Sequence, residues 1–257
     1  MTPLALAPPS TFAKIRFVLT DMDETLTYRG LLSARVYGAL ERLRDSGWIV
    51  IPVTAAPAGW CDQMARMWPI DGVIAENGGL FLQRTENGHG VTRRYWDGPH
   101  DRARVAARLA EISRLELPGA ELADDQPFRL TSVGFRKPND VAVRNAIVSA
   151  LRKDHANVTV NNLWVLAWFG DYDKLSMARR ILREVYDVDI DADRDSIVYC
   201  GDSTNDAPMF GHFLHTIGVS TVRECLADIP VPPRWITQGP GGDGFVELAE
   251  ALLSSRN

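Results

Sequence analysis

Short apolar runs and amphipathic segments alternate over the first third of the chain. The runs at 15–20, 48–53 and 72–75 are rich in β-branched residues, which is typical of buried strands. Between them, segments 31–46 and 60–68 carry apolar side chains at helical spacing. This alternation of strands and helices predicts a parallel sheet whose two faces are covered by helices.

The pattern changes in the middle of the chain, where Arg becomes more frequent. The elements predicted there are strands at 93–96, 128–135, 157–160 and 163–169 and helices at 100–117 and 140–153. Their order favours a separate α+β insert over residues 85–168.

The first pattern resumes after the insert. Helices are predicted at 173–186 and 244–253, and strands at 196–200 and 216–219. The fold class is therefore predicted to be α/β, with a Rossmann-like, doubly wound parallel-sheet core formed by residues 1–84 and 169–257.

Acidic residues follow two of the predicted core strands. Asp21 and Asp23 come directly after the first strand, and Asp202 and Asp206 follow the strand at 196–200. Ligands of open parallel sheets bind beyond the carboxyl ends of the strands, where these carboxylates would repel one another. A divalent cation removes that repulsion, and carboxylate ligands suit Mg²⁺. Helix capping is the alternative for either cluster alone, but it does not explain two clusters at one edge.

A phosphate group would suit such a site. Thr54, at the end of the second strand, could donate a hydroxyl hydrogen bond, and Lys174, near a helix start, could supply positive charge. Taken singly, Thr54 is more typical of a turn residue and Lys174 of a solvated surface lysine.

Composition and charge narrow the classes of partner. The formal net charge of −5 argues against nucleic acid or an anionic membrane as a partner. No uninterrupted apolar stretch approaches 18 residues, and residues 1–10 lack the basic start of a signal peptide. The three scattered cysteines form neither a disulfide framework nor a zinc pattern, and the five histidines show no metal-ligand grouping. We expect a cytoplasmic monomer or homodimer with reduced cysteines.

Four segments together resemble the haloacid dehalogenase-like hydrolase superfamily. They are Asp21-Met22-Asp23-Glu24-Thr25-Leu26-Thr27, Thr54 in Val53-Thr54-Ala55-Ala56, Lys174, and Gly201-Asp202-Ser203-Thr204-Asn205-Asp206. The insert between the second and third segments resembles the C2B-type cap of subclass IIB, the branch of the Cof-like phosphatases, sucrose-phosphatases and phosphomannomutases. The chain departs from the family pattern at Glu24, where Gly is usual, and at Ala55-Ala56, where Gly-Arg is common.

The resemblance implies a Mg²⁺-dependent phosphatase that acts on a small phosphorylated metabolite, such as a sugar phosphate, through an aspartyl-phosphate intermediate. Asp21 would be the nucleophile and Asp23 the general acid and base. Mg²⁺ would be held by Asp21, the backbone carbonyl of Asp23, and Asp202, with Asp206 close by. Asn205 would orient Lys174 or Asp206. The implied substrate-binding residues are Thr25, Thr54, Ala55, Lys174, Asn205 and Arg129.

Specificity is expected to come from the insert. In the predicted strand at 128–135, Phe128 and Leu130 share one face, which leaves Arg129 on the other face and directs it to the site if the apolar face meets the cap helices. The other candidates are Arg136, Lys137, Asn161, Asn162 and Trp164; for the arginines, surface solvation is the alternative.

Three other functions compete with a phosphatase. A phosphomutase shares the aspartyl-phosphate chemistry, and a non-catalytic phosphate- or metal-binding regulator shares the fold. The regulator is disfavoured because it would not need Asp23. A dinucleotide binder is disfavoured because the first strand ends in acidic residues rather than in a glycine-rich loop.

Overall fold

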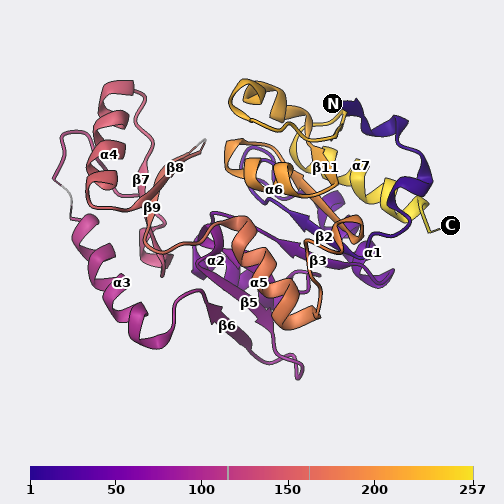
Figure 1. The fold of residues 1–257 in the computed structure, drawn as a ribbon, viewed down its shortest axis with the longest axis horizontal. Helices are drawn as coiled ribbons and strands as arrows, with labels where there is room; N and C mark the ends of the chain where they lie inside the picture. The colour runs from indigo at the N-terminus through magenta and orange to yellow at the C-terminus, as the bar shows by residue number, and fades with distance from the viewer. Residues whose placement is uncertain (115, 162, 257) are drawn as a thin grey trace.

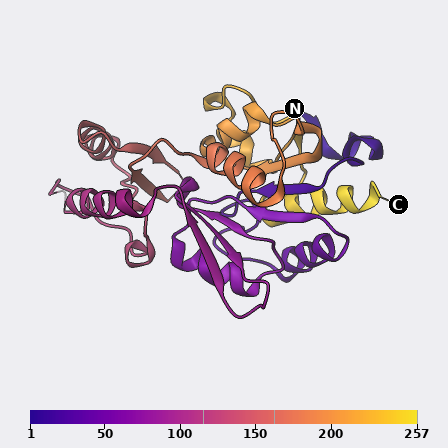
Figure 2. The same cartoon turned by 60° about the horizontal axis from the view of Figure 1, so that its bottom comes forward.

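Two α/β units make up the chain in the computed structural model, which describes residues 1–114, 116–161 and 163–256. The larger unit carries both termini, and the smaller unit, which contains the helices α3 (Pro99–Ile112) and α4 (Val141–Lys153), projects from one side of it (Figures 1 and 2). The smaller unit is built from an internal segment of the chain. Among the described residues, no helix combines the length and the apolar character needed to cross a bilayer.

The core is a six-stranded parallel sheet in the order β1-β12-β11-β10-β2-β3. The strands are β1 (Thr2–Pro3), β2 (Phe17–Thr20), β3 (Ile49–Pro52), β10 (Ile197–Gly201), β11 (His215–Gly218) and β12 (Trp235–Ile236). The chain winds outward from β2 to β3 on one side and from β10 to β12 on the other. The boundary between β2 and β10 is therefore the topological switch point, where α/β folds bind their ligands.

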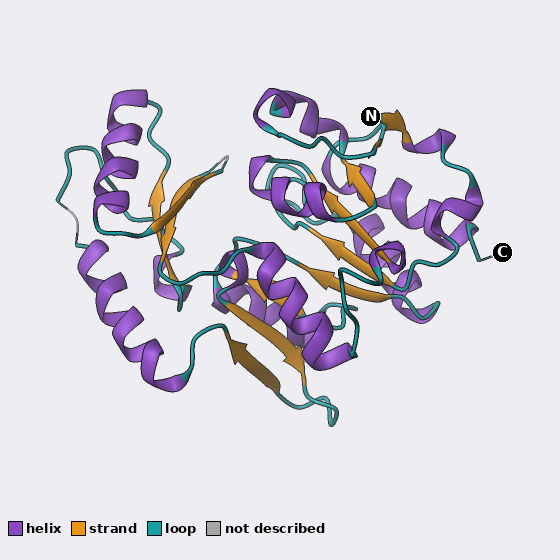
Figure 3. Ribbon diagram, in the orientation of Figure 1, coloured by secondary structure: helices purple, strands orange, loops and turns teal. Residues whose placement is uncertain are grey.

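Helices cover both faces of this sheet, as Figure 3 shows. On one face, α1 (Ala34–Asp45), α2 (Ala58–Met67) and α7 (Gly241–Ser254) share an apolar cluster with alternate strand residues such as Val18 and Val50. On the other, α5 (Lys174–Tyr186) and α6 (Ala207–His212) pack on Phe17 and Leu19. Because successive strand residues face opposite sides, a strand buried on both faces is apolar throughout. This is the doubly wound α/β class that the sequence predicted.

A second sheet joins the core to the smaller unit. It is antiparallel, with the order β4 (Val73–Ala75), β5 (Leu80–Arg84), β6 (Val91–Tyr95). The strand predicted at 93–96 was expected to begin the insert, but it pairs with β5 instead. Residues 85–95 thus continue the sheet of β4 and β5, beyond the boundary predicted after residue 84.

The smaller unit has its own apolar cluster beneath a three-stranded antiparallel sheet. Its elements are α3 (Pro99–Ile112), β7 (Ser132–Arg136), α4 (Val141–Lys153), β8 (Asn157–Val160) and β9 (Trp164–Trp168). The strand predicted at 128–135 begins only at Ser132, because 126–128 form a 3-10 helix. The strand alternation assumed for Arg129 was therefore wrong, and Phe128 and Leu130, about half exposed, do not form a buried face.

Candidate active site

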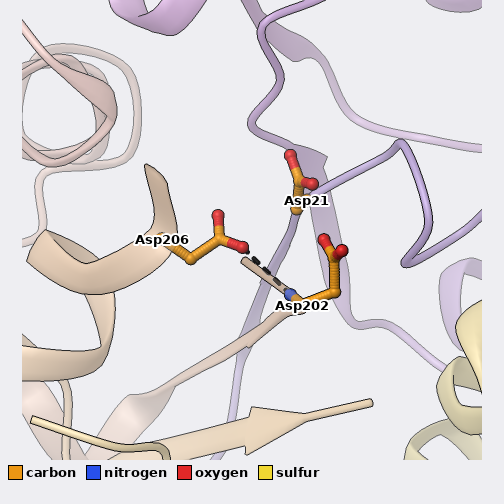
Figure 4. A group of neighbouring side chains, drawn as sticks. All are labelled: Asp21, Asp202 and Asp206. Carbon is orange, nitrogen blue, oxygen red and sulfur yellow. Dashed lines mark hydrogen bonds between the residues drawn. The ribbon is translucent and has the colours of Figure 1, made fainter. Parts of the chain in front are cut away.

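Three buried carboxylates meet at the switch point. Asp21 is the first residue after β2, and its backbone N–H still donates to Cys200 of β10, at 2.8 Å. Asp202 is the first residue after β10, and Asp206 lies one turn further on, in the 3-10 helix Thr204–Asp206. Each of the three offers an oxygen within 4.8 Å of the others. Figure 4 shows the side chains converging from these two neighbouring strand ends.

Lys174 lies between two of these carboxylates. Its Nζ is 2.7 Å from Asp21 Oδ1 and 2.7 Å from Asp206 Oδ1, and its side chain is only 2% exposed. Lys174 is the first residue of α5, whose start is fixed by a capping box between Asp173 and Ser176. The alternative that Lys174 is a solvated surface lysine is therefore wrong.

Asp206 is held by four hydrogen-bond donors. Its Oδ1 accepts from Lys174 and from the hydroxyl of Tyr199, and its Oδ2 accepts from the backbone N–H groups of Asp202, at 3.0 Å, and Ser203, at 3.1 Å. Asp206 thus fixes both the ammonium of Lys174 and the loop that carries Asp202. Sequence reasoning missed Tyr199, because an aromatic residue inside an apolar strand is normally core packing.

The buried charges perturb one another. Burial raises the pKa of Asp21 to about 7 and the nearby Asp206 carboxylate adds to this, although Lys174 opposes it. The pKa of Asp202 is also raised, first by burial and then by repulsion from Asp21 and Asp206. Burial alone would lower the pKa of Lys174, but attraction to Asp206 and Asp21 raises it overall. One ammonium therefore does not neutralise three carboxylates.

The donor set fits a hard divalent cation. Asp21 Oδ2 and Asp202 Oδ2 accept no hydrogen bond from the described part of the chain, whereas Thr25 donates to Asp202 Oδ1 at 3.2 Å. Two carboxylate oxygens thus remain available in a buried site of excess negative charge. Such all-oxygen ligands are those that Mg²⁺ and similar ions prefer. Asp21 and Asp202 are the residues that could hold the ion directly.

A cavity opens beside these carboxylates. It has a volume of about 440 Å³ and is lined by Asp21, Asp23, Ala55, Asp202 and Asn205 of the core together with Asn161 and Leu163 of the smaller unit. A second cavity of about 490 Å³ shares several of these walls and reaches Lys137. Burial raises the pKa of Asp23, which faces the first cavity, to about 6. The smaller unit therefore forms one wall of the space in front of Asp21.

Other predicted residues have different surroundings. Thr54 is buried, and its hydroxyl accepts from the N–H of Ala56 at 2.9 Å. Arg129 is buried too, so surface solvation is wrong for it, and its guanidinium contacts the carbonyl oxygen of Ala55 at 3.1 Å. The side chain of Asn205 accepts a hydrogen bond from the Ser203 hydroxyl and forms none with the side chains of Lys174 or Asp206.

The remaining specificity candidates of the smaller unit differ in their exposure and in their hydrogen bonds. Arg136 is exposed, Trp164 is half-buried, and Asn161 accepts backbone hydrogen bonds from Leu163 and Trp164 within its own turn. Asn162 lies outside the described residues.

Solved structures share this architecture over nearly the whole chain. A Thermoplasma acidophilum protein has a TM-score of 0.72 at 19% identity, covering 93% of this chain and 99% of its own. A haloacid dehalogenase-like hydrolase from Bacteroides thetaiotaomicron has a TM-score of 0.67 at 16% identity, covering 92% and 99%. The Synechocystis sucrose-phosphatase, solved with sucrose and phosphate, has a TM-score of 0.66 at 14% identity, covering 93% and 98%.

Fold and site thus define a doubly wound α/β protein with an acidic centre at its switch point. Its fold is that of the haloacid dehalogenase-like hydrolases, which confirms the fold that the four sequence segments implied. No protein-family model and no curated protein matches the sequence. Since one fold serves many functions, the activity has to be argued from the site.

Proposed function

We propose that this protein is a Mg²⁺-dependent phosphatase of the haloacid dehalogenase-like superfamily, acting on a small phosphorylated metabolite, with a sugar phosphate as the leading class. The observation that carries the proposal is the buried set of Asp21, Lys174 and Asp202 at the switch point, with Asp23 beside it in an open cavity. A structural neighbour that is a sucrose-phosphatase supports the substrate class.

In the first step, a carboxylate oxygen of Asp21 attacks phosphorus while the bond from phosphorus to the leaving oxygen breaks. Lys174 favours the ionised, nucleophilic form of Asp21 because it stands 2.7 Å from that carboxylate. Asp23 donates its proton to the leaving oxygen. Its pKa, raised to about 6 by burial, allows a useful fraction of Asp23 to carry that proton near neutral pH.

In the second step, Asp23 takes a proton from a water molecule, which attacks the aspartyl-phosphate and releases orthophosphate. Lys174 and the Thr54 hydroxyl stabilise negative charge on the phosphoryl oxygens during both steps. A Mg²⁺ ion held by Asp21, the Asp23 carbonyl and Asp202 would supply electrostatic stabilisation of that charge.

We propose that the smaller unit acts as a C2B-type cap. Asn161 and Leu163 stand in the wall of the cavity that contains Asp21, so a leaving group would be enclosed between the two units. Closure of the two units over a bound substrate would exclude bulk water from the reacting phosphoryl group. The functional cap then consists of the residues between β6 and α5, a little shorter than the predicted 85–168.

The test is a screen for orthophosphate release from sugar phosphates, nucleotides and phosphoglycerate derivatives, with and without Mg²⁺. The Asp21→Asn variant should lose at least about 10⁴-fold in kcat, because the covalent route is removed. Glu111→Gln, an exposed substitution on α3, serves as the matched control and should keep full activity. Substantial Mg²⁺-dependent turnover by Asp21→Asn would refute the assigned nucleophile. A requirement for a bisphosphate activator would indicate a phosphomutase instead.

A further inference from the structure

Glu76 is a fully buried carboxylate outside the acidic centre. It lies in the turn after β4 and accepts five hydrogen bonds. Its Oε1 accepts from the N–H groups of Ala58, at 2.9 Å, and Leu130, at 2.8 Å. Its Oε2 accepts from the N–H and hydroxyl of Thr131, at 2.9 and 3.0 Å, and from the hydroxyl of Ser132, at 2.6 Å. One side chain therefore binds the first residue of α2 in the core and three successive residues of the smaller unit.

These hydrogen bonds explain how a carboxylate at position 76 can be buried in the folded protein. Taking a carboxylate out of water is costly unless hydrogen bonds replace its hydration. Two carboxylate oxygens accept about four hydrogen bonds at full capacity, so five donors saturate Glu76. Among the described residues, no Lys, Arg or His forms an ion pair with it. Glu76 is thus held by donors from both units, and separating the units would leave the charge unsatisfied.

Arg129 adds a second connection between the same two segments. Its Nε and Nη2 pair with both oxygens of Asp125, at 2.8 and 2.7 Å, within the smaller unit. Its Nη1 reaches across to the carbonyl oxygen of Ala55, at 3.1 Å. Residues 129–132, here called the pinned segment, are therefore connected to both ends of the core loop 55–58, to Ala55 directly through Arg129 and to Ala58 through the shared acceptor Glu76. Ala55 lines the cavity with Asp21 and Asp23.

The turn that carries Glu76 also packs against the start of α5. Gly78 has a φ of +110°, and a Cβ there would lie 2.3 Å from the carbonyl oxygen of Asp173, the N-cap residue of α5. A Cβ on Gly79 would lie 2.0 Å from the hydroxyl oxygen of Thr131 in the pinned segment. The turn is therefore in close contact with the helix start that presents Lys174 and with the smaller unit.

A backbone hydrogen bond connects the turn that carries Glu76 to Thr54, which directly precedes the core loop. The N–H of Asn77 donates to the carbonyl oxygen of Thr54 at 3.0 Å. We propose that Glu76 is a positioning residue that pins the smaller unit to the core and, through its turn, sets the places of Thr54–Ala55 and of Lys174. The catalytic roles of Thr54 and Lys174 rest on the proposed function, but the structural coupling between Glu76 and these residues does not.

The primary test replaces Glu76 by Gln, which keeps the shape of the side chain but removes its charge. The new amide NH₂ group would also face hydrogen-bond donors of the protein instead of acceptors. Amide hydrogen exchange should accelerate at least about tenfold in peptides covering 55–60 and 128–133. The dissociation constant of inorganic orthophosphate should rise in parallel, and with p-nitrophenyl phosphate kcat should fall more than KM rises. Asp71→Asn is the matched control, since Asp71 is a half-buried core carboxylate whose one hydrogen-bond donor among the described residues is the N–H of Val50, at 2.8 Å. Asp71→Asn should leave the exchange rates of both peptides unchanged.

Two further variants keep the inference falsifiable if Glu76→Gln does not fold. Glu76→Asp retains the charge and should restore part of the exchange protection. Gly79→Ala leaves Glu76 intact but drives a methyl group into Thr131, so it should accelerate exchange at 128–133 and weaken orthophosphate binding together.

Several results would overturn the coupling. Faster exchange at 128–133 with unchanged exchange at 55–60 would show that Glu76 only holds the pinned segment. Unchanged exchange in both peptides would show that Glu76 positions nothing. If the wild-type protein neither binds orthophosphate nor hydrolyses any phosphate ester, the proposed function fails, and the exchange measurements still decide the coupling.

Discussion

Replacing Asp21 by Asn should stabilise the protein at neutral and alkaline pH when divalent ions are removed, even though it should abolish activity. The reason is that ionised Asp21 is buried beside Asp206 and only partly compensated by Lys174. Asn has nearly the same shape as a protonated Asp and keeps an oxygen that can accept from Lys174. The substitution therefore removes a buried charge without creating a cavity.

The size of the effect follows from the pKa of Asp21. Burial raises that pKa from 3.8 to about 7 in the folded protein, a shift of roughly three units. The folded state thus binds more protons than the unfolded state between pH 4 and 7, so stability falls as pH rises through this window. Each unit corresponds to about 1.4 kcal/mol, which gives a penalty of about 4 kcal/mol at pH 8 and about 1–2 kcal/mol at pH 5. Asn carries no such penalty at any pH.

The measurement is urea unfolding in EDTA at pH 5 and pH 8, followed by the fluorescence of the seven tryptophans. Asp21→Asn should exceed the wild type in unfolding free energy by about 4 kcal/mol at pH 8, with the gap shrinking at pH 5. Glu111→Gln should track the wild type at both pH values. Saturating Mg²⁺ should then stabilise the wild type, by about 2.7 kcal/mol at a hundred times its dissociation constant, and Asp21→Asn much less.

The reasoning would be refuted by an Asp21→Asn protein that is no more stable than the wild type at pH 8 in EDTA. It would also be refuted by a gap that widens as the pH falls, because this is the opposite sign from a raised carboxyl pKa.

Two other substitutions test separate parts of the site. Lys174→Met should lower kcat by about 10²–10³-fold and, in EDTA at pH 8, the unfolding free energy by about 3–5 kcal/mol, since it leaves two buried carboxylates without their cation; steady-state kinetics and urea unfolding would show this. Thr54→Val should lower kcat by about 10²-fold in an orthophosphate-release assay but unfolding free energy by only about 1 kcal/mol, because its hydroxyl accepts a single backbone N–H, from Ala56.

The core and the acidic centre could be predicted from the sequence because their signals are local. An apolar run of strand length followed by Asp predicts both the strand and the acidic residue at its carboxyl end, as at β2 and β10. The pairing of β1 with β12 has no such signal. Each strand is two residues long, and Thr2 meets Trp235 across nearly the whole chain.

The smaller unit was harder to read because its turns interrupt its patterns. The alternation at 128–135 predicts a strand, but the preceding Pro127 lacks a backbone N–H and favours the 3-10 helix that is present at 126–128. The alternation predicts Arg129 on a strand face, whereas Arg129 lies in the turn before β7 and pairs with Asp125.

Long-range bonding partners were invisible in the sequence. Glu76 reads as part of a Gly-containing turn, and its partners in the pinned segment lie more than fifty residues further along the chain. Tyr199 reads as core packing, and its hydroxyl bond to Asp206 depends on the loop that returns after β10. In both cases the residue type is compatible with an ordinary structural role, and the hydrogen-bond partners come close only in the folded chain.

Helix capping, the structural alternative to a metal site, accounts for only one of the three acidic residues. Asp206 takes part in a capping box with Ser203 at the start of its 3-10 helix. The side chains of Asp21 and Asp202 cap no helix in the described part of the chain; α1 and α5 are capped by Ser33 and Asp173. Both nevertheless remain buried with raised pKa values, which weakens the fold at neutral pH. Destabilising groups that serve no structural purpose cluster at functional sites, and a bound cation would offset the repulsion between these two.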